Sequence, residues 1–300
     1  MSVSIPYKRE MEFEYGRLDQ LAPGVRRVIA NNPSAFTFHG TGTYILGEGE
    51  VAVIDPGPAD PEHISAIFEA TKGERITHVL ITHTHMDHSP GYQLMKPRCD
   101  AVTYGFGPHG SGKLEEGIKV EEGGDMEFMP DEKVSQGDLI EGENWSVECV
   151  YTPGHTSNHV CYQLKEGHIL FTGDHVMGWS TSIVSPPDGD MEAYMSSLEL
   201  LLDRDDDVYW PTHGPAITDP KTHVSAFIAH RNEREEQILA CIDQGIYGIG
   251  EMVPKMYQDT PEFMYPAAAR SVLASVEYMA KRGVLIADSE SLMEAQLRRG

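Results

Sequence analysis

The densest group of metal-binding residue types in this 300-residue chain is the segment THTHMDH. His83 and His85 are two residues apart and follow the apolar run 76–81, which predicts a buried strand. Side chains at positions i and i+2 of an extended segment point to the same side, and Asp87 and His88 follow in a turn. Imidazole and carboxylate ligands suit zinc, iron or manganese. The alternative is a polar turn of hydrogen-bonded histidines, and the density of ligand-type residues makes it the weaker interpretation.

Three further ligand-type residues each follow a short apolar run, at a turn rich in Thr, Pro or Gly. The turns read TPGHT, TGD and PTHG, and they present His155, Asp174 and His213. Loops at the ends of rigid strands can hold a side chain accurately. We therefore predict that these three residues join the first cluster in one metal site.

Such a site needs alternating strands and helices, and the first two thirds of the chain has that pattern. The predicted strands are 25–29, 35–46, 51–54, 76–81, 145–151, 160–164, 168–171 and 208–210, and the predicted helices are 61–70 and 191–202. Helices 220–244, 250–257 and 266–281 and a short strand 284–287 follow. This order predicts an α/β layered catalytic domain over residues 1–218 and a mainly α, winged-helix-like domain over residues 219–300.

The blocks HTHMDH, TPGHT, GD and THG, in this order, resemble the signature of the metallo-β-lactamase superfamily over roughly residues 20–218. The resemblance implies a four-layer αβ/βα sandwich and a pair of metal ions bridged by one carboxylate. It implies that the first metal ion binds His83, His85 and His155, that the second binds Asp87, His88 and His213, and that Asp174 bridges both.

Two residues outside this ligand set are candidates for supporting roles. Asp55, in the turn IDPG, resembles the family carboxylate that holds the HxHxDH loop in place, and a turn aspartate that caps its own backbone is an equal alternative. His159 follows His155 by four residues and is expected beside the metals or the substrate. The other histidines are expected to be ordinary surface or core residues. They include His63, His109 and His230.

The segment HRNEREEQIL, which begins at His230, is similar to a helix of the β-lactamase-like protein 2 group, in which a winged-helix-like domain follows the sandwich. Acidic residues outnumber basic residues over 219–300, and the helix 266–281 is mostly apolar. We therefore expect this domain to pack against the catalytic domain or to form a wall of its pocket, and we expect no DNA partner.

The net charge of −24 arises from 23 Lys and Arg against 47 Asp and Glu. This charge disfavours RNA and anionic membranes as partners. The sequence shows no signal peptide and no apolar run of membrane-spanning length, so a cytoplasmic location is expected. The four cysteines form no CxxC pair. A small-molecule substrate is the expected partner, and a homo-oligomer is compatible with the sequence.

These features predict a hydrolase with two Zn²⁺ per chain, with iron or manganese as alternatives. A metal-activated hydroxide would cleave an acyl bond (thioester, lactone, ester or lactam), with Asp87 and Asp174 as catalytic carboxylates. Trp179 and Tyr104, at the glycine-rich loops 178–190 and 105–131, are expected to face the substrate. An endoribonuclease acting on single-stranded RNA is the main alternative. The non-hydrolase alternatives are a mononuclear iron dioxygenase and a metal-binding sensor on the same fold.

Overall fold

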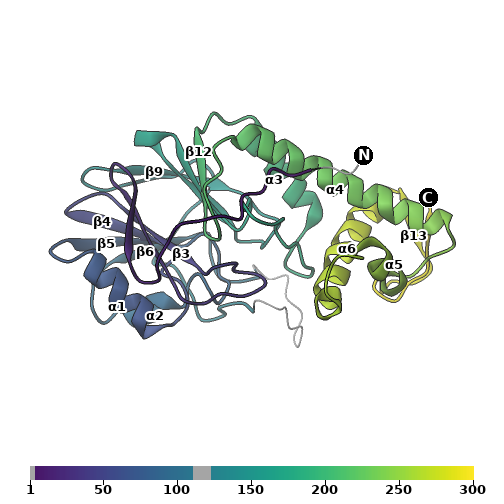
Figure 1. Cartoon of the computed structure of the whole chain (residues 1–300), viewed down its shortest axis with the longest axis horizontal. Coiled ribbons are helices and arrows are strands. Elements are labelled where there is room, and N and C mark those ends of the chain that lie inside the picture. Colours follow the sequence, from purple (N-terminus) through teal and green to yellow (C-terminus); the bar gives the residue numbers. More distant parts are fainter. Residues whose placement is uncertain (1–3, 111–122) are drawn as a thin grey trace.

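The computed structural model describes residues 4–110 and 123–300, and it contains two β-sheets packed face to face (Figure 1). The first sheet has the order β1 (Leu18–Ala22), β2 (Val25–Ile29), β3 (Gly42–Leu46), β4 (Glu50–Ile54), β5 (Arg75–Leu80), β6 (Val102–Gly105) and β7 (Glu132–Lys133). The second has the order β12 (Val208–Pro211), β11 (Ile169–Gly173), β10 (Val160–Leu164), β9 (Ser146–Tyr151) and β8 (Leu139–Glu141).

The alternation of apolar side chains along the strands builds four layers. On β4, Ala52 and Ile54 face the core between the sheets, whereas Val51 and Val53 belong to the core beneath α1 (Pro61–Ala70) and α2 (Gly91–Met95). Apolar residues on both faces of a strand are typical of a sheet covered on both sides.

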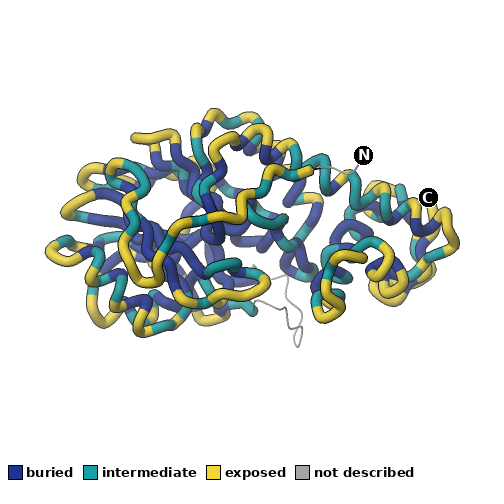
Figure 2. The backbone as a smooth tube through the Cα atoms, in the orientation of Figure 1, coloured by how far each residue is buried: buried dark blue, intermediate teal, exposed yellow. Residues whose placement is uncertain are grey.

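The second sheet is covered on its outer face in the same way. On β9, Cys149 faces the core between the sheets, and Val150 packs in the core under α3 (Met191–Leu202) and α4 (Pro220–Asp243). Buried residues therefore run along both sheets, with exposed residues at the periphery (Figure 2). The four-layer αβ/βα arrangement predicted from the sequence is confirmed.

The C-terminal unit is built around α4, which is one continuous helix. Its first half places Val224 and Phe227 in the core of the second sheet, and its second half places Ile238 and Ile242 in a separate C-terminal core. That second core also contains residues of α5 (Ile249–Met256), α6 (Tyr265–Lys281) and the hairpin β13 (Leu285–Ala287) and β14 (Leu297–Arg299). The helix shared by both cores lies just after the predicted boundary at 218/219 and attaches the C-terminal unit to the sandwich.

The predicted strands differ from the structure in two ways. The predicted strand 35–46 is reduced to β3, because Phe38 at φ 57° and Gly40 at φ 133° have left-handed backbones that interrupt an extended segment. A Cβ on Gly40 would lie 2.1 Å from the carbonyl oxygen of Ala30, so this turn needs glycine. Five strands were not predicted. Of these, β1, β6, β7 and β8 lie at or next to the edges of the two large sheets, and β14 pairs with β13 to form the C-terminal hairpin.

Part of the predicted loop 105–131 lies outside the described residues, at positions 111–122. Over the positions that the structure describes, no helix combines the length and the apolar character needed to cross a membrane.

Candidate metal centre

Strand direction explains why residues from four separate segments meet at one edge of the sandwich. Strands β4 and β5 are parallel, so Asp55 and the loop from Thr82 to His88 follow them at the same edge. In the second sheet, β10 lies antiparallel between β9 and β11, and β12 is parallel to β11. The turns with His155, Asp174 and His213 therefore leave that sheet on one side. The backbone N–H of Val160 donates to the Thr82 carbonyl oxygen at 2.8 Å and ties the two edges together.

The first group of potential ligands consists of three imidazoles. Nδ1 of His85 lies 2.9 Å from Nε2 of His83 and 3.1 Å from Nε2 of His155. The ligand atoms of this group all lie within 4.8 Å of one another, and the three side chains are buried. The arrangement brings together the three residues that the family resemblance assigned to the first metal ion.

The second group shares a carboxylate with the first. Nε2 of His213 lies 3.1 Å from Oδ2 of Asp87 and 3.4 Å from Oδ1 of Asp174. Oδ2 of Asp174 lies 3.5 Å from Nε2 of His88 and 3.8 Å from Nε2 of His155. Asp174 thus lies between the two groups, where a bridging ligand would have to lie.

Hydrogen bonds on the far side of the rings fix which nitrogen of each histidine faces the centre. Nδ1 of His155 donates to the Ile183 carbonyl oxygen at 2.6 Å, and Nδ1 of His213 donates to the Gly40 carbonyl oxygen at 3.2 Å. Because a carbonyl oxygen can only accept, Nδ1 of each ring carries a proton, so Nε2 is the nitrogen available to a metal ion at the centre. His88 is held in the same way, through Nδ1 and the Asp55 carboxylate at 2.8 Å.

These donors fit a cation better than they fit one another. Burial, reinforced by the neighbouring imidazoles, holds the pKa of His83 and of His85 well below the usual range, so both rings are neutral with free lone pairs. Among the described residues, Nε2 of His88 and Oδ1 of Asp174 are buried without a hydrogen-bond partner. The centre therefore contains nitrogen and carboxylate oxygen atoms with too few hydrogen-bond donors to pair with them. This is expected of a metal-binding site.

Three carboxylates lie in or beside the second group and act on the pKa of His88. Burial, which would lower the pKa of His88, is outweighed by Asp87, Asp174 and Asp55, so this pKa lies well above its usual range. Burial would raise the pKa of Asp174, and the charges of His213 and His88 outweigh it and hold this pKa well below its usual range. Asp174 therefore remains ionised and suits a hard or borderline divalent cation.

Asp55 supports the loop of potential ligands rather than its own turn. Its carboxylate accepts hydrogen bonds from the Thr82 backbone N–H at 2.8 Å, the Thr82 hydroxyl at 2.7 Å, Nδ1 of His88 at 2.8 Å and the Thr212 hydroxyl at 3.1 Å. Asp55 is fully buried and has a left-handed backbone at φ 48°. It therefore joins the loops that follow β5 and β12 and orients His88.

His159 lies directly behind the centre. Its Nε2 accepts from the backbone N–H of Asp174 at 3.2 Å, and its Nδ1 lies 2.9 Å from the Thr152 hydroxyl. Gly173 keeps this contact open, because a Cβ there would lie 2.6 Å from Nε2 of His159. The side chain therefore positions Asp174, in line with one of the two roles expected for it.

The two aromatic residues expected at the substrate lie in different places. The ring of Trp179 stacks on Phe38 at a centroid distance of 4.8 Å and lines a cavity of about 400 Å³. Tyr104 does not have the expected position facing the substrate. Its ring stacks on His78 at a centroid distance of 5.4 Å and packs against the core between the sheets. It lines neither that cavity nor the small one at His85 and His155.

Sequence reasoning missed His109. Its ring lies 5.8 Å from that of His85, its Nδ1 is 2.9 Å from the Thr84 hydroxyl, and it lines the small cavity beside His155. Its segment, GPHG, carries no spacing relative to the other histidines that would have placed it there. Only the fold brings the loop after β6 onto the loop of potential ligands.

Comparisons with known proteins agree with this geometry. The sequence profile of the metallo-beta-lactamase superfamily matches residues 37–213, and that of the beta-lactamase associated winged helix domain matches residues 249–291. A beta-lactamase-like protein 2 homolog of Drosophila melanogaster is 33% identical over 89% of this chain and 91% of its own length. An atrochrysone carboxyl ACP thioesterase of Cryptosporiopsis sp. (strain 8999) is 31% identical over 76% of this chain and 65% of its own length.

Solved structures show the same fold over at least 94% of the chain. A beta-lactamase domain protein from Burkholderia ambifaria superposes with a TM-score of 0.79 at 18% identity and covers 99% of this chain and 97% of that one. A metallo-beta-lactamase family protein from Thermus thermophilus superposes with a TM-score of 0.75 at 20% identity, over 94% and 100% of the two chains. The chain therefore belongs to the metallo-beta-lactamase superfamily of hydrolases and carries the C-terminal winged-helix domain associated with it.

Proposed function

We propose that this enzyme hydrolyses an acyl bond of a small molecule, with a thioester as the first candidate, at a dinuclear zinc centre. The observation that carries the proposal is the pair of adjacent ligand groups that meet at Asp174. One site would be formed by His83, His85 and His155, and the other by Asp87, His88 and His213.

The donor set supports zinc as the first choice, since imidazole and carboxylate are its usual ligands in hydrolases and no thiolate is present among the grouped residues. Iron and manganese accept the same donors. When bound, the two cations would supply Lewis acidity toward the scissile carbonyl and would lower the pKa of water toward neutrality.

The residues of the chain have separate tasks around that chemistry. The Asp87 side chain is 19% exposed against 11% for Asp174, so it is the more accessible carboxylate. Burial, which would raise the pKa of Asp87, is outweighed by His88 and His213, and the pKa is lowered to about 2. Asp87 is therefore ionised at neutral pH, which is the form that can ligate a metal ion and accept a hydrogen bond from an incoming water. Asp174 holds the two groups at a fixed separation.

The substrate class rests on charge, surroundings and relatives. A net charge of −24 gives an extended polyanion such as RNA little long-range attraction. The cavity at Trp179 also has aromatic and apolar walls, which suit a compact organic acyl group. Three of the fungal relatives, at 30–32% identity, are named atrochrysone carboxyl ACP thioesterases. We therefore place thioesters ahead of lactones, esters and lactams.

The test is a hydrolase panel on protein of measured metal content, with acyl thioesters, lactones, a chromogenic β-lactam and single-stranded RNA. We expect acyl hydrolysis that is lost on chelation and in His85→Asn. The control is His168→Asn, a surface histidine whose left-handed backbone asparagine tolerates. Cleavage of RNA alone, or turnover unaffected by loss of metal, would contradict the proposal.

A further inference from the structure

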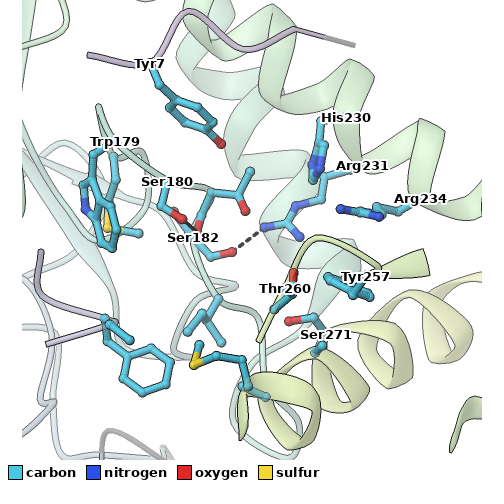
Figure 3. Close-up of a pocket in the computed structure, with 18 of the residues that line it drawn as sticks. Tyr7, Trp179, Ser180, Ser182, His230, Arg231, Arg234, Tyr257, Thr260 and Ser271 are labelled. Carbon is cyan, nitrogen blue, oxygen red and sulfur yellow. Dashed lines mark hydrogen bonds between the residues drawn. The ribbon is translucent and has the colours of Figure 1, made fainter. Parts of the chain in front are cut away.

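The cavity lined by Trp179 lies where the C-terminal domain meets the sandwich (Figure 3). One wall is the segment from Met177 to Ile183, and the opposite wall is formed by α4, the residues after α5 and the start of α6. Its volume is about 400 Å³. A space of this size between two domains is a common place for a small ligand.

Arginine side chains of α4 reach this cavity, and none of the described residues that line it carries a carboxylate. Arg231 is 7% exposed, donates to the Ser182 carbonyl oxygen and packs over the ring of Tyr194. Arg234 donates from Nη1 to Gln237 Oε1 at 2.7 Å, and its guanidinium lies 4.4 Å from the ring centroid of Tyr257. Within the described part of the chain, neither guanidinium forms an ion pair with an acid, although the chain contains 47 acidic residues.

Several hydrogen-bond donors at this cavity lack an acceptor among the residues that the structure describes. The Nε–H groups of Arg231 and Arg234 and the Nε1–H of Trp179 are buried without such a partner. Burial, together with the charges of Arg231 and Arg234, lowers the pKa of His230 to about 3, which reports a positive potential at this wall. Buried donors without acceptors next to uncompensated cations favour a ligand that accepts hydrogen bonds and carries negative charge.

A short backbone segment connects this cavity to the metal centre. The Ser182 carbonyl oxygen accepts from Arg231, and the next carbonyl oxygen, of Ile183, accepts from Nδ1 of His155 at 2.6 Å. Ile183 lines both this cavity and the small one at His85 and His155. The cavity with the arginines therefore adjoins the metal centre at Ile183.

We propose that Arg231 and Arg234 form an anion-recognition subsite that selects acyl substrates bearing a carboxylate or phosphate away from the scissile bond. The inference rests on the proposed acyl hydrolysis and adds a specificity determinant to it. Arg231 also holds the Ser182 segment, whereas the hydrogen bonds of Arg234 among the described residues stay within its own domain. Arg234→Gln is therefore the variant that tests recognition with the smaller structural effect.

The first experiment compares kcat/KM for matched thioesters. In the first pair, the acyl group ends in a carboxylate in one thioester and in its methyl ester in the other. In the second pair, the thiol is 4′-phosphopantetheine in one thioester and pantetheine in the other. The two pairs separate an anion on the acyl side from an anion on the thiol side. We expect the wild-type protein to prefer the anionic member of one pair, and Arg234→Gln to reduce that preference about tenfold or more, mainly through KM. Arg282→Gln, which removes an equal charge from a surface pair with Glu235, should leave the preference unchanged.

The second experiment measures binding without turnover. Phenylbutyrate, its amide and inorganic phosphate are titrated into metal-free protein while tryptophan fluorescence is recorded, with Trp179→Phe to assign the signal. Binding of an anion that depends on Arg234 supports the subsite even if no acyl substrate is hydrolysed, which would overturn only the proposed function. Hydrolysis with no preference for anionic substrates and no such binding would overturn the inference. Displacement of the bound anion by single-stranded RNA at lower concentration, dependent on Arg234, would also overturn it and assign the cavity to RNA.

Discussion

Replacing Asp55 with asparagine tests whether this carboxylate holds the loop of potential ligands. The Asp55 oxygen Oδ2 accepts from the Thr82 hydroxyl, from Nδ1 of His88 and from the Thr212 hydroxyl, and Oδ1 accepts from the Thr82 backbone N–H. Asparagine keeps one acceptor and turns the other into a donor. The favoured orientation keeps its oxygen at the Oδ2 position, because three donors meet there.

The side-chain NH2 group of the asparagine then faces the Thr82 backbone N–H, which donates to the carboxylate at 2.8 Å in the wild-type protein. One charge-assisted hydrogen bond is lost and a buried N–H remains without a partner, which costs about 2–3 kcal/mol of unfolding free energy. His88 also exchanges a carboxylate for a neutral oxygen, which reduces the basicity of its inward Nε2. Loss of such a supporting partner lowers metal affinity by about 10–100-fold.

The assay pairs urea unfolding of the metal-free protein with metal affinity measured against a competing chelator. Thr212→Val is the matched control, since it removes only one of the three donors to Oδ2 and leaves the carboxylate charge beside His88. We expect it to cost about 1 kcal/mol and to change metal affinity only a few-fold. If Asp55→Asn behaves like this control in both measurements, the role assigned to Asp55 is wrong.

Three further predictions test the surroundings of the centre. Gly173→Ala places a Cβ 2.6 Å from Nε2 of His159 and should reduce stability and metal content. The control is Gly24→Ala, at a glycine that also has a left-handed backbone but has open space around it, and its effect should be smaller. Equal effects of the two substitutions would contradict the packing argument. Burial lowers the pKa of His63 to about 4, so the stabilisation by its neutral ring is present above about pH 6.5 and is lost as the pH falls to 4. In urea unfolding, the stability difference between wild type and His63→Gln should shrink over that range by up to about 3 kcal/mol. A difference that stays constant with pH would refute this prediction. Trp179→Ala should raise KM for acyl substrates about tenfold and leave metal content unchanged, and unaltered kinetics would remove Trp179 from the substrate cavity.

Much of the site could be predicted from the sequence because each potential ligand follows a strand directly. The turn after an apolar strand has a fixed position relative to the sheet, so local patterns at His155, Asp174 and His213 were sufficient to suggest a common edge. The family resemblance supplied the pairing of these residues into two groups. The strand directions in the structure then account for their convergence.

The residues that the sequence missed or misplaced depend on contacts between distant segments. His109 reaches His85 only because the loop after β6 folds over the Thr84 hydroxyl. Tyr104 lies on β6, where strand alternation and the stacking partner His78 turn its ring toward the sheet core rather than the cavity. Asp55 was ambiguous, because a turn aspartate that caps its own backbone has the same local sequence as one that accepts from Thr212, 157 positions away.

The C-terminal domain shows the same limit. Helical spacing predicted α4, α5 and α6, but β14 has little apolar content and becomes a strand only because β13 lies beside it. Nor could spacing show that α4 belongs to two cores, with Phe227 in one and Ile238 in the other. The arginine-lined cavity depends on that shared helix.

The most direct test of the central idea is the number of divalent cations that the purified protein holds, measured by elemental mass spectrometry alongside its protein concentration. We predict about two per chain in the wild-type protein, about one in His213→Asn, and loss of both with loss of turnover after chelation. Fewer than one cation per chain in active protein, or full turnover after exhaustive chelation, would contradict the account.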